Sequence, residues 1–171
     1  DVLAYLSRND EALRLLERAL LLDDRSAQIW AQHGQVLRRL KRFDAALTSY
    51  TRAVELEPEH DWAWSGRGLT LSYLGRHEEA LFCFEKALDL NNYDAWYWYN
   101  HADELYTLNR FEEAITSLDE ALKLNPRHIE TWAKRGQVLR ELKRHEESLV
   151  DFDRAVRLNP RYAWAWNGRA L

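Results

Sequence analysis

The sequence predicts an all-α solenoid made of 34-residue units, each containing two helices. Tryptophan recurs with a constant step of 34 residues, at Trp30, Trp64, Trp98, Trp132 and Trp166. Small residues keep the same step in several columns. The 171 residues include only six glycines and three prolines, and no stretch sustains the alternation of a β-strand. A fixed period of this length is typical of solenoids, in which each unit buries one face against its neighbours.

The columns of small residues indicate how the predicted helices pack. Glycine follows the repeating tryptophan by four residues at Gly34, Gly68 and Gly136, and alanine takes this place at Ala102 and Ala170. A second column holds Ala12, Ala46, Ala80, Ala114 and Ser148. A third holds Ala19, Ala53, Ala87, Ala121 and Ala155. Small side chains let helix backbones approach closely, so we expect these columns to lie where helices touch.

Each unit is expected to contain two helices separated by a short break. In the last complete unit, Trp132, Gly136 and Leu139 stand at i, i+4 and i+7, which places them on one helical stripe. The break is expected near Lys143 and Arg144. The apolar residues of the second helix follow at spacings of three and four: Leu149, Phe152, Ala155 and Val156. A proline then ends this helix, because proline cannot continue the backbone hydrogen-bond ladder.

The whole chain, 1–171, is predicted to form a single array. Its complete units are 27–60, 61–94, 95–128 and 129–162; a piece rich in second-helix pattern, 1–26, precedes them, and the start of a truncated unit, 163–171, follows. The chain begins with Asp1 and contains no methionine, so we expect it to be a fragment of a longer protein. Solenoids normally carry polar capping units. Neither end shows one, so we expect both ends to be adhesive.

This pattern of Trp, Gly/Ala, Leu, Ala, aromatic, Ala and Pro at period 34 resembles the tetratricopeptide repeat (TPR) family over essentially the whole chain. The sequences of the repeats are similar to those of TPR arrays common in bacteria, including cyanobacteria. The resemblance implies a right-handed α-α superhelix that binds proteins and has no catalytic activity. One column departs from the family pattern, because residues that are usually apolar are His33, Arg67, His101, Arg135 and Arg169. We expect these side chains to reach water or to pair with a neighbouring carboxylate.

The resemblance also implies a ligand-binding groove, since one stripe of the first helices lines the concave surface of TPR proteins. The candidate groove residues are Gln35, Arg38, Arg39, Trp62, Tyr73, Trp96, Tyr99, Asp103, Tyr106, Arg140 and Trp164. Trp and Tyr are enriched at binding hot spots. The alternative is that Trp62, Trp96 and Trp164 cover the helix of the adjacent unit. Similarly, Arg38 and Arg39 are either an ordinary solvated helix end or a contact for acidic groups of a partner. The residues of the carboxylate clamp and of the asparagine ladder, known from other TPR proteins, are not present.

Composition argues against several other classes of function. The net charge is −4, so a nucleic-acid surface is not expected. The one cysteine, Cys83, cannot form an internal disulfide, and the histidines of each repeat column lie two units apart, so we expect no metal site. No nucleotide-binding or nucleophile motif occurs, and we expect no cofactor and no catalysis. No apolar run reaches the length of a membrane span. A reducing compartment, the cytoplasm, fits best.

Three functions remain open at this point. The first is a protein-interaction module or scaffold that binds a peptide or helix of a partner in an aromatic-lined groove. The second is a structural spacer or a self-assembling rod that stacks end to end. The third is the sensor or scaffold region of a larger enzyme or signalling protein.

Overall fold

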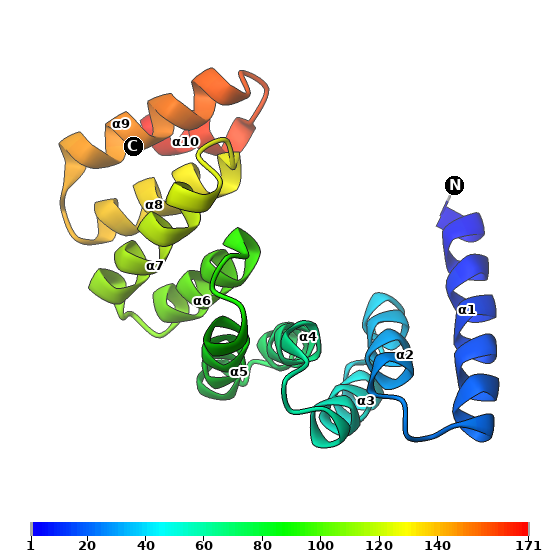
Figure 1. Ribbon diagram of the computed structural model, residues 1–171. Coiled ribbons are helices and arrows are strands. Elements are labelled where there is room, and N and C mark those ends of the chain that lie inside the picture. The colour runs from blue at the N-terminus through cyan, green and yellow to red at the C-terminus, as the bar shows by residue number, and fades with distance from the viewer. Residues whose placement is uncertain (1, 171) are drawn as a thin grey trace. The chain divides into compact units, whose positions relative to one another are not determined.

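The computed structural model describes residues 2–170, with side chains from residue 8 onward, and every regular element of this part is an α-helix (Figure 1). The helices are α1 (Val2–Leu22), α2 (Ala27–Arg39), α3 (Phe43–Leu56), α4 (Asp61–Tyr73), α5 (His77–Leu90), α6 (Ala95–Thr107), α7 (Phe111–Leu124), α8 (Ile129–Glu141), α9 (His145–Leu158) and α10 (Ala163–Ala170). The predicted all-α repeat architecture is confirmed, because helices of 13 and 14 residues alternate from α2 to α9.

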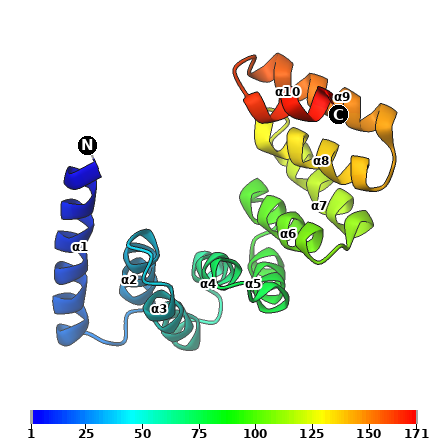
Figure 2. The ribbon, with the colours of Figure 1, turned by 180° about the vertical axis from the view of Figure 1, so that it is seen from behind.

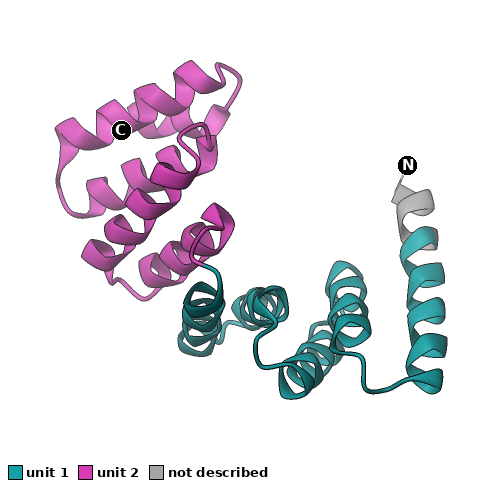
Figure 3. Ribbon diagram, viewed as in Figure 1, with its two compact units in different colours: residues 1–91 teal, residues 92–171 magenta. Residues whose placement is uncertain are grey.

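The chain forms two compact units, residues 1–91 and residues 92–171, shown in teal and magenta in Figure 3. In the first unit, each helix from α1 to α5 packs on the next, and α2 also packs on α4. In the second unit, successive helices from α6 to α10 pack in the same way, and α8 also contacts α6 and α10. The view from behind in Figure 2 shows the same order within each unit. First helices are therefore neighbours of first helices within each unit.

The turn inside each repeat uses one residue in the left-handed backbone region. These residues are Lys41, Gly75, Asn109 and Lys143, with φ between 59° and 74°. In each turn, the amide N–H of the following arginine donates to the carbonyl of the leucine five residues earlier, for example Arg42 to Leu37 at 2.9 Å. This arrangement matches a common C-terminal cap of α-helices, in which one residue in the left-handed region lets carbonyl groups of the last turn accept hydrogen bonds. The tight turn sets the second helix against the first.

The core of each unit contains the predicted columns of small residues. Ala46, Ala80 and Ala114 are fully buried, and so is the column of Ala53, Ala87, Ala121 and Ala155. Large side chains fill the space beside them, such as Tyr50 in the first unit and Phe152 in the second. The expectation that small residues mark the close approach of helices is confirmed for the columns between Ala46 and Ala155, whereas Ala12 and Ala19 on α1 are half-buried and Ala170 on α10 is exposed.

The repeating tryptophans lie at the edge of this core and have a second role. Each indole Nε1–H donates to the backbone carbonyl six residues earlier, at 2.8 to 3.0 Å. The acceptor is the carbonyl of Asp24, Pro58, Asn92, Pro126 or Pro160. Each bond closes the turn that leads from one repeat into the next. Trp and Tyr usually find such a partner when they are partly buried.

Candidate functional site

The first-helix surface of the first unit consists of Gln35, Arg38 and Arg39 on α2 together with Trp62 and Tyr73 on α4. Trp62 is half-buried and packs against the core cluster around Ala31 and Tyr50. Tyr73 is 64% exposed, and its ring stacks on Phe43 with centroids 5.0 Å apart. Of the two predicted aromatic residues in this unit, Tyr73 therefore offers the more accessible ring.

Arg38 and Arg39 differ although they are adjacent. Arg38 is half-buried beside the hydroxyl of Tyr50. Burial raises the pKa of the Tyr50 phenol, and Arg38 lowers it in part. The Nε of Arg38 finds no hydrogen-bond acceptor among the described residues. Arg39 is exposed, so its guanidinium group is accessible to a partner.

The first-helix surface of the second unit begins with Trp96 and Tyr99 on α6. Trp96 is 47% exposed and stacks on Tyr99, with ring centroids 5.7 Å apart. Tyr99 also contacts the His128 ring edge-on at 5.5 Å. The equivalent positions in other repeats are the buried Ala31, Ser65 and Ala133. Tyr99 is thus held between neighbours, and burial raises the pKa of its phenol.

Lys134 of α8, which sequence reasoning did not select, stands at the centre of this surface. Its ammonium group lies 2.5 Å from a carboxylate oxygen of Asp103 on α6. The same group lies 4.8 Å from the ring centroid of Tyr106 and 5.8 Å from that of Trp164. Its side chain is only 13% exposed. An ammonium over an aromatic face is attracted by the ring quadrupole. Lys134 therefore joins three predicted residues from α6 and α10 into one cluster.

A smaller residue at a position that packs against this column in other repeats explains how a lysine fits there. The equivalent positions Gly66 and Gly168 lie against the rings of Tyr50 and Phe152, which are sixteen residues earlier in each case. Sixteen residues before Lys134 stands Leu118, which is smaller than either ring. The lysine stem therefore has room that the glycine positions lack. The pair of Leu118 with Lys134 is the one signal in the sequence for this lysine, and it is a weak one, because Asn100 follows the ring of Phe84 by the same sixteen residues and is not glycine.

Two predicted residues complete the second surface. The hydroxyl of Tyr106 accepts a hydrogen bond from Nε2 of Gln137 at 2.8 Å. Arg140 is half-buried with its guanidinium carbon 6.0 Å from the centroid of Phe152, and its Nη1 has no acceptor among the described residues. Within the second unit, Asp103, Tyr106 and Trp164 thus meet through Lys134, whereas Arg140 lies against Phe152 outside that cluster.

The polar column before the glycine lies between the helices of each repeat. Nδ1 of His33 is 2.9 Å from Oγ of Ser49, and Nδ1 of His101 is 2.9 Å from Oγ of Ser117. Each serine hydroxyl also donates to a carbonyl one turn earlier in its own helix. The serine proton is thereby used, so each ring donates through Nδ1–H. The expected pairing with carboxylates is confirmed for Arg135 and for Arg169, whose Nε lies 2.7 Å from Asp153.

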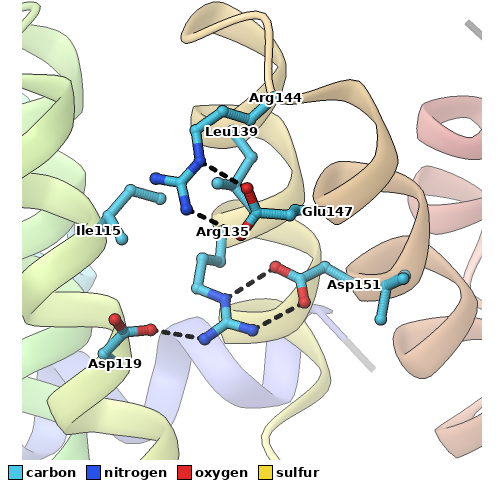
Figure 4. A pocket seen from close by; sticks show the side chains of 8 residues that line it. Ile115, Asp119, Arg135, Leu139, Arg144, Glu147 and Asp151 are labelled. Atoms are coloured by element: carbon cyan, nitrogen blue, oxygen red, sulfur yellow. Dashed lines mark hydrogen bonds and ion pairs between the residues drawn. The ribbon is translucent and has the colours of Figure 1, made fainter.

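Arg135 is the best-connected member of that column. It binds Asp151 of α9 through two nitrogens, at 2.7 and 2.8 Å, and Asp119 of α7 through the third (Figure 4). Burial opposes the charge of Arg135, but hydrogen bonds and charges from both aspartates outweigh it and raise the pKa of the guanidinium group. The residue in this column and its partner on the second helix change together: His33 and His101 face serine, whereas Arg135 faces aspartate.

A pocket of about 220 Å³ opens beside Arg135, among α7, α8 and α9 (Figure 4). Its lining residues are Ile115, Asp119, Arg135, Leu139, Arg144, Glu147, Val150 and Asp151. Every charged group of the lining is paired with another member, since Arg144 binds Glu147 through two bonds of 2.7 Å. The pocket contains none of the predicted groove residues, and its internal pairing leaves no unpaired charge for a ligand.

Burial of His101 predicts a loss of stability in mild acid. Burial lowers the pKa of the His101 imidazole to about 4, from an ordinary value of 6.5. The unfolded chain therefore binds the proton more readily, and stability that is complete above pH 6.5 falls as the pH drops toward 4. The loss attributable to this residue is at most about 3 kcal/mol. Urea unfolding at pH 7 and pH 4.5 should show a smaller difference for His101→Gln than for the wild type.

The matched control for this prediction is His145→Gln, because His145 is exposed at the start of α9. Its loss of stability between the two pH values should equal that of the wild type. An unchanged acid dependence in His101→Gln would contradict the assignment.

The described residues contain neither a metal site nor a membrane span. Within this part of the chain, no group of three or more His, Cys, Asp or Glu side chains is placed to hold a metal ion. None of the described helices combines the length and the apolar character that crossing a bilayer requires.

Comparison with known proteins agrees with the geometry. Three solved structures superpose over most of their length. YrrB, a TPR protein with an unusual peptide-binding site, gives a TM-score of 0.84 at 20% identity, covering 99% of this chain and 88% of that one. MamA gives 0.84 at 17% identity, with 91% of both chains covered. MamA 41-end from Desulfovibrio magneticus RS-1 gives 0.83 at 21% identity, with 90% and 87% covered.

Sequence comparison identifies the family. No curated protein sequence matches the chain significantly. Family models described as tetratricopeptide repeat match residues 25–92 and 99–163, which together are well over half of the chain. The chain belongs to the tetratricopeptide repeat family.

Proposed function

We propose that the chain is a non-catalytic protein-interaction scaffold that binds a peptide or helix of a partner on its first-helix surfaces. TPR proteins are generally interaction modules rather than enzymes, and YrrB has a peptide-binding site. The proposed setting is the cytoplasm, where Cys83 remains a free thiol.

The observation that carries this proposal is the exposed indole of Trp96 in the second unit. Nearly half of this large ring faces solvent, although it is stacked on Tyr99. Tyr106 and Trp164 already contact Lys134 of the same chain, so Trp96 provides the main apolar anchor, and the Asp103–Lys134 pair provides polar groups on the same first-helix surface. Aromatic side chains of this kind dominate the energetics of many interfaces.

The first unit contributes a second surface of different chemistry. Trp62 and Tyr73 provide apolar area, and Gln35, Arg38 and Arg39 provide donors. A partner segment that bound there would place an apolar side chain on Tyr73 and acceptor groups near the arginines.

A displayed library of random peptides, selected against the full chain, tests the proposal. Peptides that bind the wild type should lose at least about tenfold in affinity for Trp96→Ala, as expected for a hot-spot aromatic residue. Tyr99 is left intact, because its burial would make a change there destabilising. The matched control is Trp166→Ala, a similarly exposed tryptophan (44% against 47%) outside the proposed surface.

Two outcomes would contradict the proposal. The first is the recovery of no binding peptide. The second is that every recovered peptide binds the wild type and Trp96→Ala equally, whether or not Trp166→Ala weakens binding. Circular dichroism of each variant verifies that the helices are retained.

A further inference from the structure

The turn between α2 and α3 carries an excess of positive charge that its counterparts in the other repeats lack. Residues 38–45 contain Arg38, Arg39, Lys41 and Arg42 with Asp44 as the only acid, which gives a net charge of +3. The equivalent segments 72–79 and 106–113 each have a net charge of −1, and 140–147 has none. We call the four cations of the first repeat the basic turn.

A single substitution leaves one of these cations unpaired. In three repeats, the arginine before the second helix binds the glutamate three residues later through two nitrogens at 2.6 to 2.7 Å: Arg76 with Glu79, Arg110 with Glu113, and Arg144 with Glu147. In the first repeat, the position of that glutamate holds Ala45, which is exposed. Arg42 consequently has no such partner.

The other cations of the basic turn are also without a carboxylate. Among the described residues, none of Arg38, Arg39, Lys41 and Arg42 forms an ion pair. Asp44, the acid of this segment, interacts electrostatically with Arg76 of the next repeat. Arg39, Lys41 and Arg42 are all exposed. This turn therefore differs from its counterparts both in its charge and in its lack of internal neutralisation.

An aromatic platform lies next to the basic turn. Helix α2 ends at Arg39, α3 begins at Phe43, and α4 ends at Tyr73, so these residues share one edge of the first unit. The Tyr73 and Phe43 rings are nearly parallel, at 11°, and 5.0 Å apart. Tyr73 is exposed, and the ring on which it stacks, Phe43, directly follows Arg42 in the chain.

We propose that this edge binds an acidic segment of a partner protein, with carboxylates on Arg39 and Arg42 and an apolar side chain on Tyr73. Guanidinium groups bind carboxylates through two parallel hydrogen bonds, which gives both energy and orientation. The site extends the proposed peptide-binding function, and it uses no residue of the second unit. A nucleic acid fits less well, because polyanions require an extended basic track and the chain as a whole carries −4.

Fluorescence anisotropy with a defined probe tests the proposal. The probe is a labelled peptide in which glutamates flank a central tryptophan, and the full chain should bind it with an affinity that falls as salt is added. Ala45→Glu restores the arginine–glutamate pair of the other repeats and should weaken binding about twofold to fivefold. Arg39→Glu/Arg42→Glu should weaken it more than about tenfold.

The matched control for Ala45→Glu is Thr116→Glu, which makes the same change in total charge at an exposed position of α7. This variant should bind the probe as the wild type does. Both positions are exposed and helical, so both variants should retain the helical circular dichroism of the wild type.

Four results would overturn the proposal. Two concern the probe: the wild type does not bind it, or Ala45→Glu and Thr116→Glu weaken its binding equally. Two concern other ligands: a peptide with glutamine in place of glutamate binds equally well, or a single-stranded DNA of matched length binds more tightly. Each of these leaves the Trp96→Ala result in the second unit unaffected. Failure of the basic turn and failure of the interaction surface are therefore distinguishable.

Discussion

Replacing Arg135 by alanine is expected to destabilise the protein by about 3 kcal/mol. The mutation would leave the Asp151 carboxylate, whose side chain is 2% exposed, without its bidentate partner. A buried charge that loses its counter-ion bears the full penalty of its desolvation. Urea unfolding at neutral pH, followed by circular dichroism, measures the effect.

The other repeats supply the control for this prediction. Arg135→His/Asp151→Ser installs the pair seen at His101 and Ser117, and it should restore most of the lost stability. Asp151→Ser alone should cost less than Arg135→Ala, because Arg135 keeps Asp119 and is 23% exposed. A loss below about 1 kcal/mol in Arg135→Ala would show that the ion pair is not needed for stability.

Replacing Gly66 by alanine is the second change for which a large effect is expected. A Cβ atom there would overlap the Tyr50 ring, which is fully buried. Alanine is otherwise about 1 kcal/mol better than glycine inside a helix, so the sign of the result is informative. We expect a net loss of about 1–3 kcal/mol, as for overpacked cores. Thermal and urea unfolding of the variant give this number.

A double-mutant cycle tests the cause. Tyr50→Leu copies the repeat in which Leu118 precedes Lys134, so it should make room for alanine at position 66. Tyr50→Leu alone leaves a cavity and removes the hydroxyl beside Arg38. The double variant should be more stable than the sum of the two changes implies, by at least about 1 kcal/mol. Strict additivity would mean that the ring and the glycine do not interact.

The fold was predictable from the sequence because each repeat gives the same information again. A single tryptophan or alanine indicates little, but a constant step of 34 residues in several columns specifies helix pairs that bury the same face. The columns of Ala46 and Ala53 were expected at helix contacts, and both are buried. The exact place of each turn residue, such as Lys41 in the left-handed region, has no equally strong sequence signal.

The candidate site was less predictable, because its chemistry depends on contacts between columns. The stripe of the first helices identifies Tyr99 and Tyr106, but not that Lys134 lies over Tyr106 or that Tyr99 rests on His128. Such contacts join residues about thirty positions apart, and a column examined by itself does not contain them. The pair of Leu118 with Lys134, sixteen residues apart, indicates room for the lysine stem but not which ring its ammonium group contacts.

The indole-to-carbonyl bonds of the tryptophans limit where the length of a repeat can change. Each bond joins a tryptophan to a carbonyl six residues before it, so both partners lie within a short segment such as Pro58–Trp64. The acceptor is a backbone carbonyl, which every residue supplies, and it belongs to Asp, Pro or Asn in different repeats. A crossover that keeps the spacing of six residues would therefore keep the bond. An insertion or deletion inside the segment would separate the two partners, so changes in repeat length are expected instead in the turn between two helices, near Gly75.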